Sequence, residues 1–64
     1  MNKLSCIFFA LLYDQRRNHY KHVRSCVIEK YDNEKEMMID FDKWIEHQVK
    51  EYKDYTIIAV KLIK

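Results

Sequence analysis

The sequence predicts an α+β fold: a three-stranded antiparallel-type sheet in the order β-β-α-β, with one amphipathic helix packed on one face. Three observations predict it: an apolar run near the N-terminus, one segment with apolar residues at helical spacing, and a C-terminal run rich in β-branched residues. The 64 residues have room for a single domain, 1–64, whose core is marginal in size. Leu, Ile, Val and Phe form about 28% of the chain, above the roughly 20% typical of disorder, so folding is expected.

The first element covers residues 4–13, which are apolar on both faces when written as a strand. Such a run is typical of a central strand covered on both sides, although a buried helix also fits, and the two alternatives stay open. A positively charged residue, Lys3, precedes the apolar run, and a signal peptide begins in the same way. It is too short to span a bilayer, which takes about 20 residues, and no small-x-small cleavage site comes after it. We therefore expect a core segment and no membrane association.

A polar connection, residues 14–19, separates this run from a second strand expected over residues 20–30. The connection has the length of a hairpin loop. Asn18 is its best residue for a left-handed backbone conformation, since the chain contains no Gly. Val23, Val27 and Ile28 give the second strand its apolar character.

The clearest element is a helix expected over residues 34–52. Asn33 is a suitable N-cap, and Glu36 stands three residues further on, as in a capping box. Glu46 and Lys50 have the spacing of a favourable pair. Apolar residues recur at steps of three and four, which predicts one buried stripe with a mixed edge. The stripe is Met38, Phe41, Ile45, Val49 and Tyr52, and the edge is Met37, Trp44 and Gln48.

The last strand is expected over residues 55–63, beside the first strand after a right-handed crossover through the helix. One helix covers only one face of the sheet, so the opposite face exposes apolar side chains. These are Ile7, Phe9 and Leu11, with Ile57, Ala59 and Ile63 beside them. Two explanations stay open: a homodimer packed sheet to sheet, and a docking surface for another protein.

The residue types that carry catalysis or bind metals are scattered in this sequence. The three His and two Cys residues show no Cys-x-x-Cys spacing, so no metal and no cofactor is predicted. The absence of Gly excludes a Gly-rich phosphate loop, and the carboxylates of the helix fall on its polar side, so no enzyme activity is expected. Cys6 and Cys26 could lie opposite each other in the hairpin. Their redox state stays open, with two buried free thiols expected in a reducing cytoplasm.

The densest charge lies in a basic hairpin, Arg16–Arg24, which contains four basic residues and no acidic ones. Residues 29–46 contain seven acidic and three basic residues, and this asymmetry favours directed contacts with a partner. The residues expected to bind a partner are Arg16, Arg17, Tyr20, Lys21 and Arg24 of the hairpin and Ile7, Phe9 and Leu11 of the uncovered face.

The pattern resembles the small bacteriophage-encoded proteins that inhibit host enzymes. The residues that carry the resemblance are the strand HVRSCVIEKY, the acidic helix start DNEKE, the helix with Trp44 and Tyr52, and the final strand TIIAVKLIK. The resemblance implies a cytoplasmic protein that binds a host protein and inhibits or modulates it by covering its surface. The alternative is a small RNA- or DNA-binding regulator that uses the basic hairpin for phosphate contacts and stacking. The partner itself is not identified by the sequence.

Overall fold

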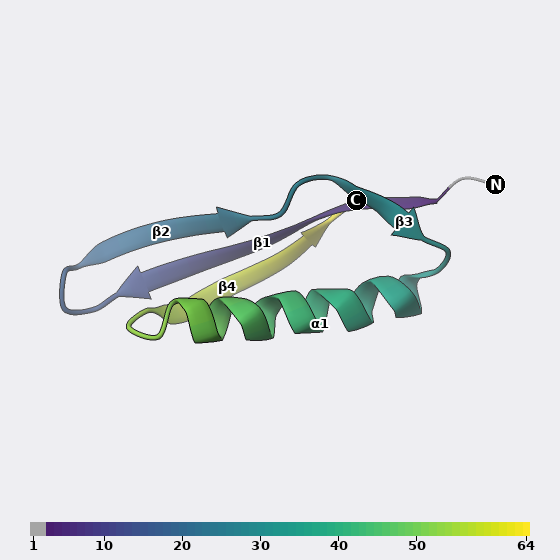
Figure 1. The fold of residues 1–64 in the computed structure, drawn as a ribbon. Coiled ribbons are helices and arrows are strands. Elements are labelled where there is room, and N and C mark those ends of the chain that lie inside the picture. The colour runs from purple at the N-terminus through teal and green to yellow at the C-terminus, as the bar shows by residue number, and fades with distance from the viewer. Residues whose placement is uncertain (1–2) are drawn as a thin grey trace.

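The computed structural model describes residues 3–64 and confirms the predicted class, with one helix against one face of an antiparallel sheet (Figure 1). The sheet has four strands instead of three. The elements are β1 (Leu4–Asp14), β2 (His19–Arg24), β3 (Ile28–Tyr31), α1 (Glu34–Glu51) and β4 (Thr56–Ile63).

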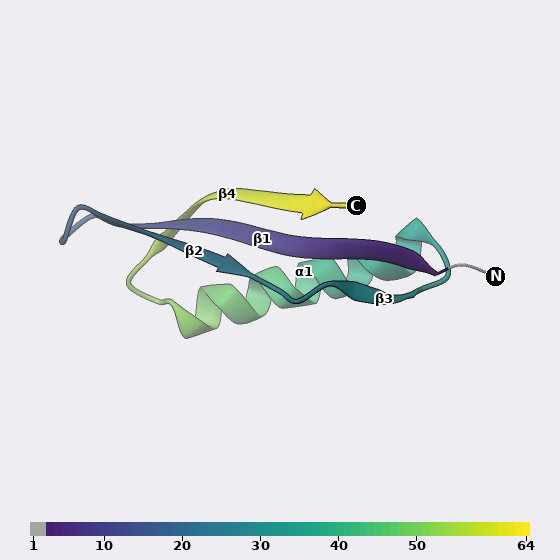
Figure 2. The ribbon, with the colours of Figure 1, turned by 90° about the horizontal axis from the view of Figure 1, so that it is seen from above.

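Strand β1 is the centre of the sheet (Figure 2). It pairs antiparallel with β4 on one side and with β2 and β3, one after the other, on its other side. The first apolar run is therefore a strand, and the last strand lies beside it as expected. Phe9 stands opposite both Arg24 and Lys61, which fixes the register of the three long strands.

The second expected strand is interrupted at Ser25–Val27, so the prediction of one continuous strand over residues 20–30 was wrong. The side chain of Ser25 explains the break. Its Oγ accepts the N–H of Phe8 at 2.9 Å and donates to the carbonyl of Cys26 at 2.8 Å. A side-chain oxygen thus takes the place of a backbone carbonyl, and the ladder with β1 continues in a shifted register.

The hairpin turn between β1 and β2 is held by side chains. Asn18 has φ 51°, which confirms its predicted left-handed conformation, and its Oδ1 accepts the Tyr13 hydroxyl at 2.9 Å. Asp14 is buried, and its Oδ1 accepts the backbone N–H of Arg16 at 3.1 Å and of Arg17 at 3.4 Å. Asp14 therefore supplies acceptors that the tight turn otherwise lacks.

The predicted helix start is also confirmed. Asn33 is the N-cap, and its Oδ1 accepts the N–H of Glu36 at 3.0 Å. The Glu36 carboxylate in turn accepts the N–H of Asp32, one residue before the cap, at 3.1 Å. Further along the helix, Lys50 and Glu46 form the expected ion pair at 3.4 Å.

The helix is rotated from the predicted phase. Met37, Phe41 and Gln48 are its buried residues, whereas Met38 and Val49 are 43% and 52% exposed, so the expectation that these two belong to the core was wrong. The aromatic rings set this phase. Phe8 of β1 packs against Phe41 and Trp44, with ring centroids 5.2 and 5.8 Å apart.

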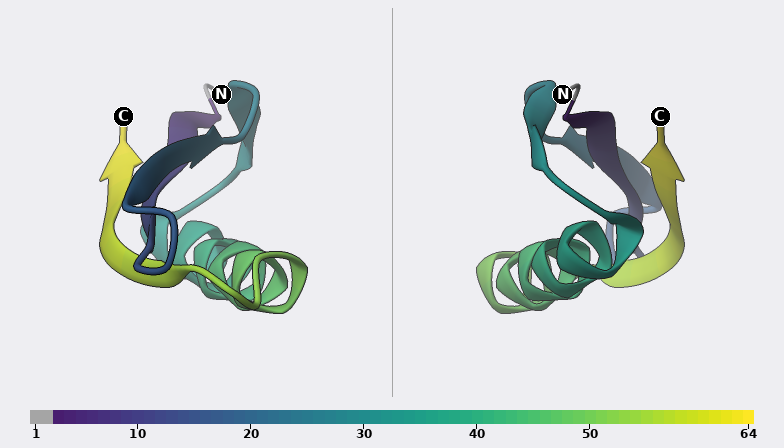
Figure 3. Two further views of the ribbon diagram at one scale, coloured as in Figure 1. Left: turned by 90° about the vertical axis from the view of Figure 1, so that its left-hand side faces the viewer. Right: turned by 90° about the vertical axis from the view of Figure 1, so that its right-hand side faces the viewer.

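The molecule is elongated, with principal extents of 48 × 16 × 14 Å. Seen along its length, α1 lies on one side of the sheet and β4 stands at the flank of the sheet (Figure 3). The core lies between α1 and the sheet and consists of Cys6, Phe8, Tyr31, Met37 and Phe41. The sheet face turned away from α1 has no second layer in the described part of the chain.

Candidate functional site

The surface that β1, β2 and β4 turn away from α1, here called the open face, is the candidate site. Side chains alternate along β1, so Phe8, Ala10 and Leu12 are buried toward the helix and the residues between them point the other way. Residues directly opposite each other on paired strands share a face. The open face consists of Ile7, Phe9, Leu11 and Tyr13 on β1, Tyr20, His22 and Arg24 on β2, and Thr56, Ala59, Lys61 and Ile63 on β4.

One residue expected on this face lies elsewhere. The ladder between β1 and β4 shifts between Leu11 and Leu12, so Ala59 stands opposite Leu11 while Ile57 stands opposite Leu12. A bulge of this kind adds a residue to one strand and moves the residues beyond it to the other face. Ile57 therefore belongs to the side of the helix, where it is half-buried. Its expected place on the open face was wrong.

Aromatic pairs run across β1 and β2 on the open face. The rings of Tyr13 and Tyr20 lie 4.8 Å apart between centroids, and those of Phe9 and His22 lie 5.6 Å apart. Cross-strand aromatic pairs stabilise a sheet and hold their side chains in place. The side chains of Phe9 and Tyr13 remain partly accessible and Tyr20 is 57% exposed, so the open face offers a preformed aromatic surface.

The open face is basic. None of these residues of β1, β2 and β4 is acidic, and two of them, Arg24 and Lys61, are basic. The wider charge distribution agrees with this. Residues 3–31 and 55–64, within which the strands lie, contain eight basic and two acidic residues, whereas residues 32–54 around the helix contain four basic and eight acidic residues. The molecule thus presents a basic sheet side and an acidic helix side.

A hollow opens on this face where β2 gives way to β3. It has a volume of about 400 Å³ and is lined by Ile7, Arg24, Ser25, Cys26 and Val27. Val27 is 59% exposed, so the hollow combines an apolar wall with one guanidinium group. An apolar or carboxylate side chain of a partner fits this lining.

The cysteines are both free, but they differ from the expected pair of buried thiols. Cys6 is buried in the core, and burial raises the pKa of its thiol. Cys26 is exposed in the interruption between β2 and β3, so the expectation that it packs in the core was wrong. The register explains this. The hairpin is centred between residues 16 and 17, which would place Val27 opposite Cys6, and the shift at the interruption places Ile28 there instead.

The structure separates the residues of the basic hairpin. Tyr20 and Arg24 lie on the open face with Ile7, Phe9 and Leu11. Lys21 points to the opposite side, where its ammonium group lies 5.2 Å from the centroid of the Tyr52 ring. Arg16 and Arg17 are exposed in the turn, and the Nε of Arg17 lies 3.5 Å from Asp14.

Sequence reasoning missed Tyr13, His22 and Lys61 as members of the site. The hairpin gives a signal for the first two, because a turn centred between residues 16 and 17 pairs Tyr13 with Tyr20 and Leu11 with His22. Combining that pairing with the alternation of β1 assigns both to the uncovered side. For Lys61 the signal is the alternation of β4, because Ala59 and Ile63 were already assigned to the uncovered side and Lys61 lies between them at steps of two.

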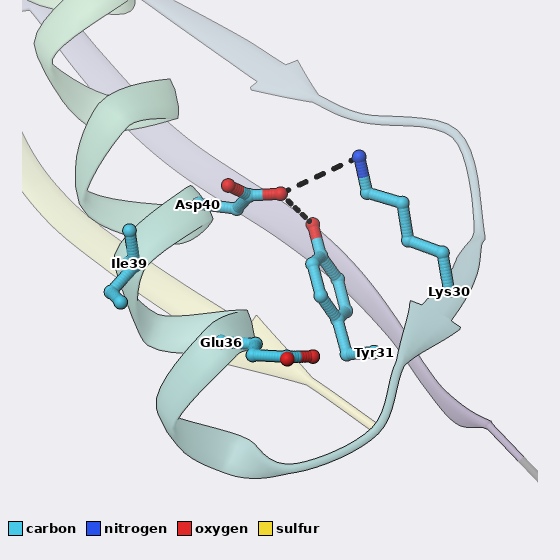
Figure 4. A pocket seen from close by; sticks show the side chains of 5 residues that line it. All are labelled: Lys30, Tyr31, Glu36, Ile39 and Asp40. Atoms are coloured by element: carbon cyan, nitrogen blue, oxygen red, sulfur yellow. Dashed lines mark hydrogen bonds and ion pairs between the residues drawn. The ribbon is translucent and has the colours of Figure 1, made fainter.

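A second group of polar side chains lies between β3 and α1 (Figure 4). The Tyr31 hydroxyl donates to Asp40 Oδ2 at 2.9 Å, and Lys30 Nζ lies 3.5 Å from the same oxygen. Burial and this hydrogen bond raise the pKa of Tyr31 to about 12, while the hydroxyl and Lys30 lower the pKa of the Asp40 carboxyl. At neutral pH the phenol keeps its proton and the carboxylate stays charged, which suits a structural link between the two elements.

Neither a metal-binding cluster nor a membrane-spanning helix occurs within residues 3–64. No group of three or more His, Cys, Asp or Glu side chains in that range is arranged to hold a metal ion. The single helix of this part of the chain does not have the length and apolar content needed to cross a membrane.

The fold and site define a small α+β protein with one helix and one uncovered basic and aromatic sheet face. Comparison of the chain with protein-family models, with curated proteins and with solved structures finds no match. The open face itself is therefore the basis for a functional proposal.

Proposed function

We propose that this protein binds an acidic surface of another protein through its open face and inhibits or modulates that partner by covering it. The observation that carries the proposal is the composition of the face, which combines Phe9, Leu11, Tyr20 and Arg24 with no acidic residue. Aromatic residues and Arg are enriched at the centres of protein interfaces. Basic side chains around them steer an acidic partner and fix its orientation.

The proposed mechanism is occlusion without chemistry on the partner. The aromatic pairs and the aliphatic side chains supply buried area, and the hollow beside Arg24 receives one side chain of the partner. Arg16 and Arg17 at the tip extend the basic surface beyond the sheet. The resemblance to phage-encoded inhibitors supports a host protein in a bacterial cytoplasm as the partner.

Binding of single-stranded RNA or DNA is a second candidate, and one observation favours it. Tyr13, Tyr20 and Phe9 lie on an uncovered sheet surface beside Arg24 and Lys61, and bases stack on aromatic side chains in such a setting. The aliphatic residues Ile7, Leu11 and Ile63 on the same face favour a protein partner, because stacking on bases does not require them.

The test compares two variants with the same change of charge on opposite sides of the molecule. Arg24→Glu alters the open face, and Lys43→Glu alters the exposed side of α1. Each immobilised protein is incubated with a nuclease-treated bacterial lysate, and each captured protein is then purified and its Kd measured. We expect an acidic protein whose Kd rises at least about tenfold, or 1.4 kcal/mol, with Arg24→Glu and stays unchanged with Lys43→Glu.

The same two variants separate the candidates in a salt titration with a single-stranded oligonucleotide. Binding to nucleic acid weakens log-linearly with salt because counterions are released. Tight oligonucleotide binding that Arg24→Glu abolishes, together with no captured protein, would replace the first proposal by the second. Equal losses with both charge variants would contradict a site on the open face.

A further inference from the structure

The two edges of the sheet differ in how they are protected against further pairing. The edge formed by β2 and β3 is interrupted at Ser25–Val27 and carries many charges, among them Lys21, Arg24 and Lys30. Strand β4 forms the other edge with eight residues, TIIAVKLI, of which one is charged. Charges and interruptions are the usual means of preventing edge-to-edge pairing, so β4 is the edge left open to it.

Strand β4 has exposed apolar side chains on both faces of the sheet. Val60 points to the side of the helix, yet it is 45% exposed because α1 does not extend under the flank of the sheet (Figure 3). Ile63 on the open face is 43% exposed, and Ile58 at the bulge is 47% exposed. A segment that covers this edge must therefore offer apolar side chains on both of its faces, as β4 itself does.

The surface area of the chain is large for its mass. The accessible surface is 5148 Å², whereas a folded monomer of 8.0 kDa is expected to expose about 4,450 Å². The excess of roughly 700 Å² agrees with the elongated shape and with the sheet face that no second layer covers.

We infer that β4 pairs antiparallel with β4 of a second copy, about a two-fold axis through Val60, so that the two sheets join into one. In this register Val60 lies opposite the same residue of the other copy, and Ile58 lies opposite Leu62. Lys61 lies opposite Ala59, which leaves room for the lysine stem. A register centred on Lys61 instead sets two ammonium groups directly opposite each other, which is unfavourable.

The charge of the open face argues against the sheet-to-sheet homodimer that the sequence predicts as one alternative. Stacking two open faces brings together two surfaces that each carry Arg24 and Lys61 and no acidic residue of β1, β2 or β4. Pairing through β4 avoids this. It also leaves two open faces on the same side of one continuous sheet, so the inference does not depend on the proposed function.

The test begins with the mass of the protein in solution. Sedimentation equilibrium at micromolar concentration is expected to give twice the 8.0 kDa of the chain. Val60→Lys adds like charges opposite each other and should raise the dissociation constant at least about tenfold. Phe9→Glu changes the open face and should leave the dimer intact. Helix content measured by circular dichroism checks that both variants fold.

Cross-linking then tests the register in a Cys26→Ser background, which removes the exposed native thiol. Val60→Cys should form an intermolecular disulfide on air oxidation, because the two sulfur atoms meet at the axis. Ile58→Cys is the matched control, since its side chain is equally exposed but lies about 13 Å from its own copy, four residues along the strand. A monomer at all concentrations, equal cross-linking of the two variants, or a dimer broken only by Phe9→Glu would each overturn the inference.

Discussion

Tyr31 shows how one buried hydroxyl group joins two elements of the fold. Its pKa of about 12, against an ordinary value of 10.0, results first from burial and then from the hydrogen bond to Asp40. The folded protein therefore holds the phenol proton to higher pH than the unfolded chain does. The stabilising contribution of this group is fully present below pH 10 and is lost as the pH rises toward 12.

Tyr31→Phe should lower the free energy of unfolding by about 0.5–1.5 kcal/mol at pH 7, the usual contribution of one hydrogen bond. The variant should also lose stability less steeply between pH 10 and 12, because it has no phenol to titrate. The pKa of Asp40 should rise toward its ordinary value, since the hydroxyl is the largest cause of its lowering. Urea unfolding at a series of pH values measures the stability, and NMR titration of the carboxyl groups measures the pKa of Asp40. If the variant loses stability between pH 10 and 12 as steeply as the parent protein, the prediction is contradicted.

Ser25 is the second residue whose side chain decides local structure. Ser25→Ala removes the acceptor of the Phe8 N–H and leaves a backbone donor without its partner. We expect a loss of about 1–3 kcal/mol in the free energy of unfolding. Ser5→Ala, at an exposed position of β1, is the control and should change it by less than about 0.5 kcal/mol. If denaturant unfolding gives similar losses of stability for the two variants, the Ser25 hydroxyl does not stabilise the interruption between β2 and β3.

At the scale of elements, local signals predicted where structure forms, and tertiary contacts decided how it is oriented. The cap Asn33 and the left-handed Asn18 depend on neighbouring residues alone, so the sequence predicts them. The helix phase cannot be predicted from neighbouring residues, because Met37 and Met38 are both apolar. The contact of Phe8 with Phe41 and Trp44 decides which of the two methionines is buried. The place of Ile57 likewise depends on a bulge in the ladder.

The two adjacent methionines give a direct test of the helix phase. Met37 is 1% exposed and Met38 is 43% exposed. Met37→Ala should cost about 2–5 kcal/mol of stability because it leaves a cavity in the core. Met38→Ala should cost less than about 0.5 kcal/mol. Thermal or urea unfolding of the pair measures the difference, and a greater loss for Met38→Ala would restore the phase expected from the sequence.

At the scale of the whole molecule, the strands are basic and the helix region is acidic, so an acidic partner approaches the sheet side first. The tip of the hairpin takes part in this without supporting the fold. Arg17 pairs with Asp14 while its own side chain stays 78% exposed, and such pairs contribute little to stability. In the proposed complex the open face makes the remaining contacts. The sequence predicted this face only in part, because its members come from three strands.

Arg16→Ala combined with Arg17→Ala should change the free energy of unfolding by less than about 0.5 kcal/mol. Binding to the captured partner should weaken at least about tenfold, because the tip supplies charge and orientation. Calorimetric titration of the partner and thermal unfolding of the variant measure the two effects separately. Unchanged binding would restrict the interface to the open face itself.

The central claim is that a partner protein covers the open face and leaves α1 free. The most direct measurement is an amide NMR spectrum of the isotope-labelled protein with and without the captured partner, read residue by residue with cross-saturation from the partner. We expect effects on the sheet residues Phe9, Leu11, Tyr20, Arg24 and Lys61 and none on the exposed side of α1. Effects concentrated on Lys43, Glu46 and their neighbours on the helix would contradict it.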